Sequence, residues 1–502
     1  MSIGSILSVA RTALSYQQAV IQTAGHNIAN AETEGYSRQR VEAQASTPRL
    51  FTYGTIGTGV AIDDVRRMRD ALLDVSYRRE ASGFGSASLR EELLSSVEEV
   101  LGEPSDDGLA SAMDAFWSSF SELSSQPTSA AARSVVQQSA RNVATLLNGY
   151  DTRLGDLRAQ TQIRLDNAVT ELNGLTKSIA DLNGRIVEAE VGGKQAGDLR
   201  DQRDLAIDRL AALGDVRVLP QPDGSMNVVL GNSTVVDGIH NKELRLAAGT
   251  GPTIAFATVD QPSEPLLPIG GRMQTILEFL NVELPDTQER LDATANTLAG
   301  AVNAIHQRGN DGTAGAPYLA FFVDRASDSY AAGDPFASPL AAGVVTARNI
   351  GLNSVLERDG SRIATTSSLT SRPADNDVAL ALAGLRTATE VKLGGVVLGT
   401  ITFTLPDRSF NPPTRKTTPA TSMADFYRAA TSGLATKVKN AESTTAVRRT
   451  LSEQAEQRRA SVSGVNIDEE LTTLMRAQQA YAAAAKVVTA ADEMMQTLIG
   501  MI

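Results

Sequence analysis

The sequence has 502 residues, a formal net charge of −12 and no cysteine. The length leaves room for roughly three domains, and the lack of cysteine excludes disulfides, cysteine nucleophiles and thiolate metal sites. The acidic balance argues against a general nucleic-acid or anionic-membrane binder, and an aromatic content of only 4% favours helices lined by Ala and Leu over deep aromatic cores.

Residues 1–30 predict a long helix with a narrow apolar seam. Apolar positions recur at steps of three and four between Ser2, the expected N-cap, and about Asn30. Arg11 is the only formally charged residue of this segment, so we expect the helix to be surrounded by neighbours. The cationic face that a membrane-surface helix favours is missing. The segment also lacks the pattern of a cleaved signal peptide, and no stretch of the chain is apolar enough to span a bilayer.

Residues 467–502 repeat this spacing, behind a capping-box-like start at Asn466 and Glu469. A 3.5-residue repeat at both ends predicts that the two terminal helices pair. One Gln interrupts each seam, and an Asp also interrupts the second. The seam residues expected at the interface are Ile3, Leu7, Leu14, Ile21 and Ile28 in the first helix, and Leu471, Leu474, Tyr481, Val488, Met495 and Leu498 in the second.

Between the ends, the first half of the chain predicts mostly helix. Residues 35–62 alternate or are rich in Gly and Thr, which predicts a turn and extended segments. Residues 63–213 predict helices that are interrupted at GFGS (83–86) and GEPSDDG (102–108), with a helix start at Pro104. The stretch 130–190 contains no Pro and predicts one rod-like helix, packed against partners of similar length.

Four aspartates follow at helical spacing: Asp198, the expected N-cap of the next helix, then Asp201, Asp204 and Asp208. Such a cluster could hold a cation, but arginines are interleaved, with Arg200 placed to pair with Asp204. We interpret this segment as a solvated, salt-bridged helix face.

The second half of the chain mixes strands and helices. Short β-branched runs between turn sequences make 215–269 β-rich, and 316–422 contains two strands in 391–406, a loop at 408–419 and a short helix capped by Asp375 or Asn376. Helix resumes at Gly271, with a break and restart at Pro285, and the seam that follows is expected to pack antiparallel to 130–190. From Met423 helix continues to the end, broken at 463–464.

Asn303, His306 and Asp311 lie at the end of that seam, among glycines, in an arrangement that could suggest a catalytic loop. Their spacing matches no specific metal or nucleophile motif. A helix that ends at His306 and is terminated by Gly309 explains the pattern more simply. An enzyme that uses this loop stays open as the alternative.

Two terminal motifs resemble those of bacterial flagellar rod, hook and hook-associated proteins. NIANAETEGYSRQR (27–40) contains Asn27, Asn30, Gly35 and Tyr36, and SGVNIDEELTTLMRAQQAYAAAAKVVTAADEM (463–494) matches it at the other end. With DLRDQRD (198–204) and VNAIHQRGNDGTAG (302–315), the pattern is similar to the hook-associated branch that forms the first junction between hook and filament. Other rod or hook positions remain alternatives.

The resemblance implies a structural subunit without catalysis or cofactor, which self-assembles in a helical array with its terminal helices innermost. It further implies the hook protein, a second junction protein on the filament side, an export chaperone at the C-terminal helix and the flagellar secretion apparatus as partners. No nucleic acid and no membrane insertion are expected. The chain would be cytoplasmic before export and then located at the hook–filament junction.

The expected fold is mainly α with inserted β domains, a long antiparallel helical rod built from both chain ends. We predict a coiled-coil-like assembly domain (1–35 with 464–502), a helical rod domain (36–214 with 270–315 and 423–463) and β-rich outer domains (215–269 with 316–422).

Overall fold

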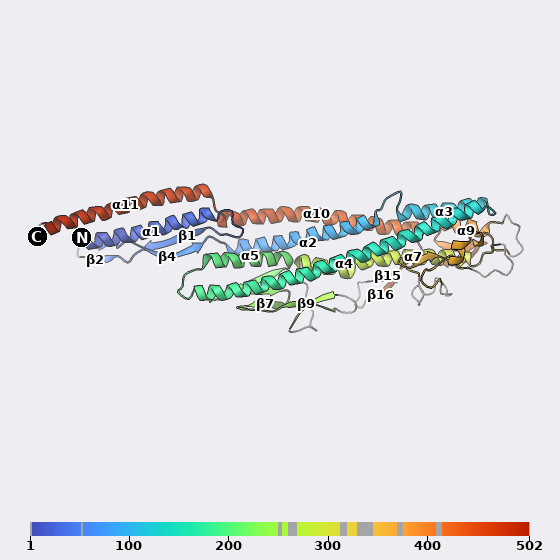
Figure 1. Cartoon of the computed structure of the whole chain (residues 1–502), viewed down its shortest axis with the longest axis horizontal. Coiled ribbons are helices and arrows are strands. Elements are labelled where there is room, and N and C mark those ends of the chain that lie inside the picture. The colour runs from blue at the N-terminus through green and yellow to red at the C-terminus, as the bar shows by residue number, and fades with distance from the viewer. Residues whose placement is uncertain are drawn as a thin grey trace.

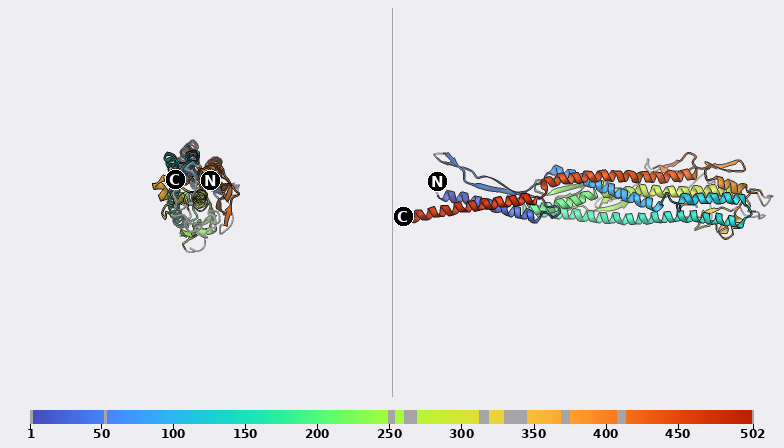
Figure 2. Two further views of the ribbon diagram at one scale, coloured as in Figure 1. Left: turned by 90° about the vertical axis from the view of Figure 1, so that its right-hand side faces the viewer. Right: turned by 90° about the horizontal axis from the view of Figure 1, so that it is seen from above.

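The computed structural model describes residues 3–51, 54–248, 254–259, 269–311, 319–328, 345–368, 375–407 and 414–500. The molecule is a long, narrow rod with both chain ends at the same tip (Figure 1). Seen end-on, the helices form a slender bundle (Figure 2). The predicted fold class, a helical rod with inserted β-structure, is confirmed.

The two terminal helices form one tip of the rod. Helix α1 (Ile3–Ala29) lies beside α11 (Ile467–Gly500), and the two run antiparallel (Figure 1). The predicted pairing of the chain ends is therefore confirmed. A β-ribbon leaves the end of α1 and returns along it: β1 (Gln39–Ala45) pairs with β4 (Val60–Arg67), and β2 (Arg49–Phe51) pairs with β3 (Gly54–Ile56).

The body of the rod is built around α4 (Ala130–Ala189), the single long helix that the Pro-free sequence predicted. Its seam residues Leu165, Leu172 and Ile179 are completely buried, and α7 (Leu284–His306) packs against it in the antiparallel sense (Figure 1). The other helices of the body are α2 (Ala71–Leu101), α3 (Leu109–Ser125), α5 (Gly197–Leu213), α6 (Gly271–Glu278) and α10 (Met423–Ser463), which packs along α2.

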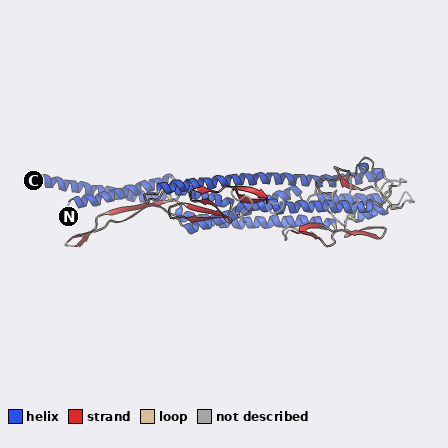
Figure 3. Ribbon diagram, turned by 90° about the horizontal axis from the view of Figure 1, so that it is seen from below, coloured by secondary structure: helices blue, strands red, loops and turns tan. Residues whose placement is uncertain are grey.

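The β-structure lies on the outside of this bundle (Figure 3). An antiparallel sheet of order β5-β6-β7-β8 lies along α4, held by Asn183, whose Nδ2 donates to the carbonyls of Met226 and Gly238 at 2.8 and 2.6 Å. Its strands, with the hairpin next to it, are β5 (Val216–Pro220), β6 (Met226–Leu230), β7 (Ser233–Asp237), β8 (His240–Asn241), β9 (Leu244–Ala248) and β10 (Ile254–Thr258).

The remaining strands and short helices lie toward the tip opposite the termini (Figure 1). They pair as three two-stranded sheets, β11-β12, β13-β14 and β15-β16. Their bounds are β11 (Phe322–Asp324), β12 (Ile350–Leu352), α8 (Ser354–Arg358), a 3₁₀ turn (Gly360–Arg362), α9 (Asp377–Gly384), β13 (Glu390–Leu393), β14 (Val396–Thr400), β15 (Thr404–Asp407) and β16 (Thr414–Thr417).

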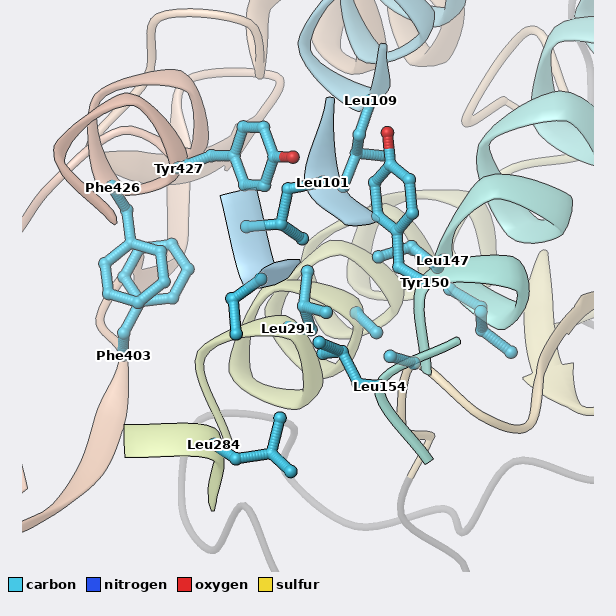
Figure 4. Close-up of a cluster of buried hydrophobic side chains, with 14 of the residues drawn as sticks. Leu101, Leu109, Leu147, Tyr150, Leu154, Leu284, Leu291, Phe403, Phe426 and Tyr427 are labelled. Atoms are coloured by element: carbon cyan, nitrogen blue, oxygen red, sulfur yellow. The ribbon is translucent and has the colours of Figure 1, made fainter. Parts of the chain in front are cut away.

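Aliphatic and aromatic side chains from α2, α3, α4, α7, α10 and the segment before β15 meet in the core of this half (Figure 4). Tyr427 of α10 donates its hydroxyl to Glu103 Oε1 at 3.2 Å, and the Phe403 and Phe426 rings stack with centroids 3.6 Å apart. Leu101 of α2 and Leu291 of α7 lie between these aromatic side chains and Tyr150 and Leu154 of α4 (Figure 4).

Several local predictions were wrong, each for a tertiary reason. The GFGS sequence does not interrupt α2; a Cβ on Gly85 would lie 3.4 Å from the Ala212 carbonyl and 3.3 Å from Arg272, so the glycine permits close helix packing. Helix α3 begins at Leu109 rather than Pro104, because the Glu103 carboxylate accepts the Ala110 N–H at 3.0 Å.

Two further boundaries differ in the second half. Pro285 lies in the first turn of α7, but the chain stays helical before it, because a π-helical turn (Phe279–Glu283) joins α6 to α7. The 391–406 segment contributes to three strands rather than two, since β15 pairs with β16, which lies in the expected loop. The break at 463–464 and the Asn376 cap position are confirmed.

His306 ends α7 as the simpler interpretation predicted, and it is 2% exposed. Its Nδ1 lies 2.8 Å from the Leu319 carbonyl, and its Nε2 accepts the Ala364 N–H at 3.1 Å. Asn303 is bound to the backbone of Phe321 and Phe322. These side chains hold the far end of α7 in place.

We predict that His306 makes the fold acid-sensitive. Burial lowers the pKa of His306 to about 4. The unfolded chain therefore takes up the proton first, and stability is lost as pH falls from about 6.5 toward 4, by about 3 kcal/mol. In a His306→Gln variant, the free energy of unfolding measured with urea should not show this loss as pH falls from 6.5 to 4. The variant is nevertheless less stable at pH 7. Equal slopes for both proteins between pH 6.5 and 4 would contradict the assignment.

Candidate assembly site at the joint between the terminal helices and the rod

A tight turn connects α1 to the β-ribbon at the point where the terminal helices meet the rod. The Thr33 N–H donates to the Asn30 carbonyl at 3.0 Å, and the Tyr36 N–H donates to the Thr33 carbonyl at 3.1 Å. Gly35 has a φ of 79°, and a Cβ there would lie 3.0 Å from Leu205 of α5. Only glycine meets both constraints.

Asn27 is the centre of this turn and is 1% exposed. Its Nδ2 donates to the Gln39 carbonyl at 2.9 Å and to Glu470 Oε2 at 3.0 Å. Its Oδ1 accepts the Tyr36 hydroxyl at 2.7 Å and the Gln39 N–H at 2.9 Å. All four hydrogen-bonding positions of the amide are thus used, and they join α1, the turn, β1 and α11.

Glu470 ties the start of α11 to the same place. It is 3% exposed, and its Oε1 accepts Arg38 Nε at 2.7 Å. Arg38 also pairs with Glu469 at 2.9 Å, and its backbone N–H donates to the Ser463 carbonyl, at the end of α10, at 2.9 Å. The break between α10 and α11 is therefore held by one arginine of the N-terminal motif.

Ser37 connects the turn to α5. Its N–H and hydroxyl donate to the two carboxylate oxygens of Asp201 at 3.0 and 2.7 Å. Arg67 of β4 pairs with Asp201 at 2.7 Å and with Asp204 at 2.8 Å, and Arg69 reaches Asp204 at 3.1 Å. The side chains of Asp201 and Asp204 are 7% and 5% exposed.

The interpretation of this aspartate cluster as a solvated face was therefore wrong for Asp201 and Asp204, although Asp198 is exposed and the salt-bridged character is confirmed. The partners come from another part of the chain. Arg200 pairs with Glu190 at 2.6 Å instead of Asp204, and Asp198 is not the N-cap, because α5 starts one residue earlier and Glu190 accepts the Ala196 N–H at 2.9 Å. Helical spacing alone could not reveal partners 134 residues away.

The ionic network continues into α2 and α10. Asp74 pairs with Arg69 at 2.7 Å. The carboxylate of Asp208 accepts hydrogen bonds from Arg78 Nε at 2.6 Å and from Arg459 Nη1 at 2.5 Å. Arg459 also lies 3.5 Å above the centre of the Tyr77 ring. The network thus connects the ribbon with three helices of the rod.

Burial and neighbouring charges act in opposite directions on the pKa of Asp204 and in the same direction on the pKa of Tyr36. Burial alone would raise the pKa of Asp204, but Arg69, Arg67 and Arg78 together hold it below its ordinary value. The pKa of Tyr36 is raised well above its ordinary value by burial and by the charges of Asp198, Asp201 and Glu470. Tyr36 is therefore a neutral hydrogen-bond donor at every physiological pH.

The predicted seam residues are only partly covered in the single chain. Leu7, Leu14, Ile21 and Ile28 are half-buried on α1, and so are Leu474, Val488 and Met495 on α11. Leu471 and Tyr481 are 45% and 40% exposed, while the side chains of Ile3 and Leu498 lie outside the described part. The buried residues of α11 after Glu470 are Ala477 and Ala491.

Glu470, Arg38, Ser37, Arg67 and Arg69 were not predicted from the sequence as residues of this joint. The first three lie inside the recognised motifs, so that signal could have identified them. The described residues contain no cluster of three or more His, Asp or Glu placed to hold a metal. Among the described helices we found none with the length and apolarity of a membrane span.

Comparisons with known proteins agree with this geometry. A model of the flagellar hook-associated protein FlgK helical domain matches residues 94–322, and a model of the flagellar basal body rod FlgEFG protein C-terminal region matches residues 456–501. Over 531 residues the chain is 30% identical to flagellar hook-associated protein 1 of Bacillus subtilis, covering 98% of this chain and 97% of that protein. The chain belongs to the flagellar hook-associated protein 1 family.

Other members of the hook-associated protein 1 family are similar over shorter lengths. The Salmonella typhimurium protein is 29% identical, across 61% of this chain and 57% of its own, and the Escherichia coli protein is 28% identical, across 63% and 60%. The solved structure of the flagellar hook junction protein FlgK from Burkholderia pseudomallei aligns with a TM-score of 0.61 at 16% identity, covering 78% of this chain and all of that one. This last likeness shows a shared fold.

We expect Asp204→Ala to destabilise the rod by about 3–5 kcal/mol, because it leaves buried arginines without their counter-charge. Asp181→Ala, which removes an exposed aspartate from α4, is the matched control and should change stability by less than about 0.5 kcal/mol. Urea unfolding at pH 7 measures both. A similar, small loss in the two variants would mean that the network does not stabilise the joint.

Asn27→Ala should loosen the terminal helices without unfolding the rod, because Glu470 Oε2 and the backbone N–H and carbonyl of Gln39 lose their hydrogen bonds to Asn27. Hydrogen exchange followed by mass spectrometry should show faster exchange in α11 and unchanged protection in α4. Gln22→Ala, at an exposed position of α1, serves as the control. Unchanged exchange in α11 would show that Asn27 does not hold the helix pair.

Proposed function

We propose that this structural flagellar subunit joins the hook to the filament by helical self-assembly through its terminal helices. The observation that carries the proposal is a helix pair that is firmly anchored at one end and incompletely covered along its length. On α11, Met475 and Ile499 are 55% and 67% exposed in addition to the exposed seam residues. Apolar helix faces of this kind are buried by further helices, and neighbouring copies would supply them.

The anchoring supports this role. Because Asn27 and Glu470 are bound to the ribbon, and Asp201 binds the turn to the rod, a force on the terminal helices is transmitted directly to the body. A subunit that joins two parts of a rotating shaft needs a stiff connection of this type. Non-closing contacts between identical copies then generate a helical array.

We infer that the chain is divided into domains with different roles. Residues 1–35 with 464–502 form the assembly domain; 36–214 with 270–315 and 423–463 form the rod domain; and 215–269 with 316–422 form outer β-rich domains. The assembly interface comprises the seam residues, and Asn27, Asn30, Gly35 and Tyr36 contribute to it by holding the helix pair in position.

The proposed partners are the hook protein, a second junction protein on the filament side, an export chaperone at the C-terminal helix and the flagellar secretion apparatus. The chain is a flagellar protein by family, and we infer that it is exported through the flagellar secretion apparatus to the hook–filament junction. We also infer that it has no catalytic role, since Asn303 and His306 are bound to backbone groups and Asp311 is paired with Arg362 at 3.0 Å. A match to the FlgK helical domain favours the junction over a rod or hook position.

Deletion of 467–502 should leave the rod folded and abolish incorporation into flagella. Cells whose only copy is truncated should make hooks without filaments and lose motility, while the purified protein still unfolds cooperatively. Normal filament growth by the truncated protein would refute the proposal.

A double variant distinguishes a defect in assembly from a defect in folding more sharply than the deletion does. Replacing Leu471 and Tyr481 together by Asp should cost little stability, because both are exposed, yet block incorporation. Ile163→Asp, at a position 60% exposed on α4, is the matched control and should be tolerated. Electron microscopy of isolated hooks with a labelled protein measures the incorporation of the double variant and of the control.

A further inference from the structure

An apolar groove with an acidic rim opens on the rod where α3 and α10 begin. It encloses about 440 Å³, and its walls include Trp117 and Met113 of α3, Tyr427 of α10 and Pro104 of the connecting loop. Glu103 and Asp114 line its edge together with Arg428. Asp114 pairs with Arg386 at 3.0 Å, and Arg428 pairs with Asp425 at 3.1 Å. Grooves of this size with apolar walls commonly accept side chains or ligands.

The chain segment on one side of this groove is acidic. Residues 91–132 contain nine Asp or Glu and not a single Lys or Arg. Asp106 and Asp107, in the loop beside the groove, are exposed and form no ion pair with the part of the chain that the structure describes. A partner segment should therefore be apolar with a positive charge.

The same chain offers such a segment farther along α10. Val447, Leu451 and Val462 are 58%, 39% and 37% exposed, and with Gln454 and Arg458 they follow helical spacing along one side of the helix. We call these five residues the α10 stripe. Arg458 is exposed and has no acidic partner among the described residues, and 447–462 contains four Arg against two Glu.

The groove and the α10 stripe cannot meet within one molecule. At about 1.5 Å per residue, the groove residues at 424–435 lie roughly 35–40 Å from the centre of the α10 stripe. At about 100° per residue, the two also lie on different sides of α10, roughly 150° apart. Two surfaces so arranged on one rod suit a heterologous contact between copies, in which each copy is shifted along the axis.

We propose that the α10 stripe of one copy docks in the acidic groove of a second copy that lies beside it, displaced by roughly 35–40 Å along the rod. This lateral contact rests on the proposed function, since it links subunits of the same helical array. The apolar stripe residues fill the groove against its exposed wall residues Pro104 and Ala110, and Arg458 approaches the carboxylates of Asp106 and Asp107. The contact does not close on itself, so it repeats along the array.

The absence of native cysteine makes this contact directly testable. In a full-length Ser432→Cys/Gln454→Cys variant, one thiol lies at the groove and the other at the α10 stripe. Within one chain the two positions are roughly 33 Å apart on the same helix, too far for a disulfide. Oxidation of flagella assembled from this variant should give a ladder of covalently linked dimers and larger species on a non-reducing gel.

The matched control moves one thiol to the other side of the helix. Ser432→Cys/Glu453→Cys has its second thiol one residue earlier, about 100° around α10, and should give no ladder. Each single-cysteine variant should also give none. Arg458→Glu in the double variant should reduce the linked fraction several-fold, whereas Arg458→Lys should preserve it.

The possible failures are distinguishable. If the double variant is located in flagella and supports motility but gives no ladder, the lateral contact is wrong and the proposed function stands. A ladder of equal yield in the Glu453 control, or in either single variant, also overturns the contact. If a protein with native termini never reaches the flagellum, the proposed function fails and the contact fails with it.

Discussion

The buried pairing of Asp201 and Asp204 with Arg67 and Arg69 is the interaction on which the architecture depends. Charges in such a dry place are costly unless each is matched, and here every carboxylate has at least one guanidinium within 3.1 Å. Because these partners come from the ribbon and from α5, the network fixes where the terminal motif lies on the rod. Ser37 then carries the same constraint to the turn after α1.

The joint and the terminal helices have opposite characters. At the joint, Asn27 and Glu470 satisfy every donor and acceptor that they bring into the interior. Beyond it, the paired helices bury mainly alanines of α11 and leave larger apolar side chains half-covered or exposed. A rigid anchor combined with an incomplete interface is what a self-assembling subunit requires, since the remaining apolar area becomes available to other copies.

The long helices and the pairing of the chain ends could be predicted from sequence, because their apolar periodicity is local and repeated over many turns. The positions where helices begin and end were harder to predict from the sequence. Glu103 caps α3 from outside the helix, and Gly85 serves helix packing rather than a turn, so the local signals at both places pointed elsewhere. The candidate site was predicted in part: Asn27, Gly35 and Tyr36 came from a motif, whereas their partner Glu470 lies 443 residues from Asn27.

By itself, the sequence determined that this protein is a helical rod with seamed ends, since residue spacing along one helix decides which face is apolar. It also carried the terminal motifs that place the chain in its family. Only the tertiary structure decided that Asp201 and Asp204 of α5 are buried rather than solvated. Spacing says which side chains share a face, but which distant arginines cover that face depends on how the ribbon folds back against the rod.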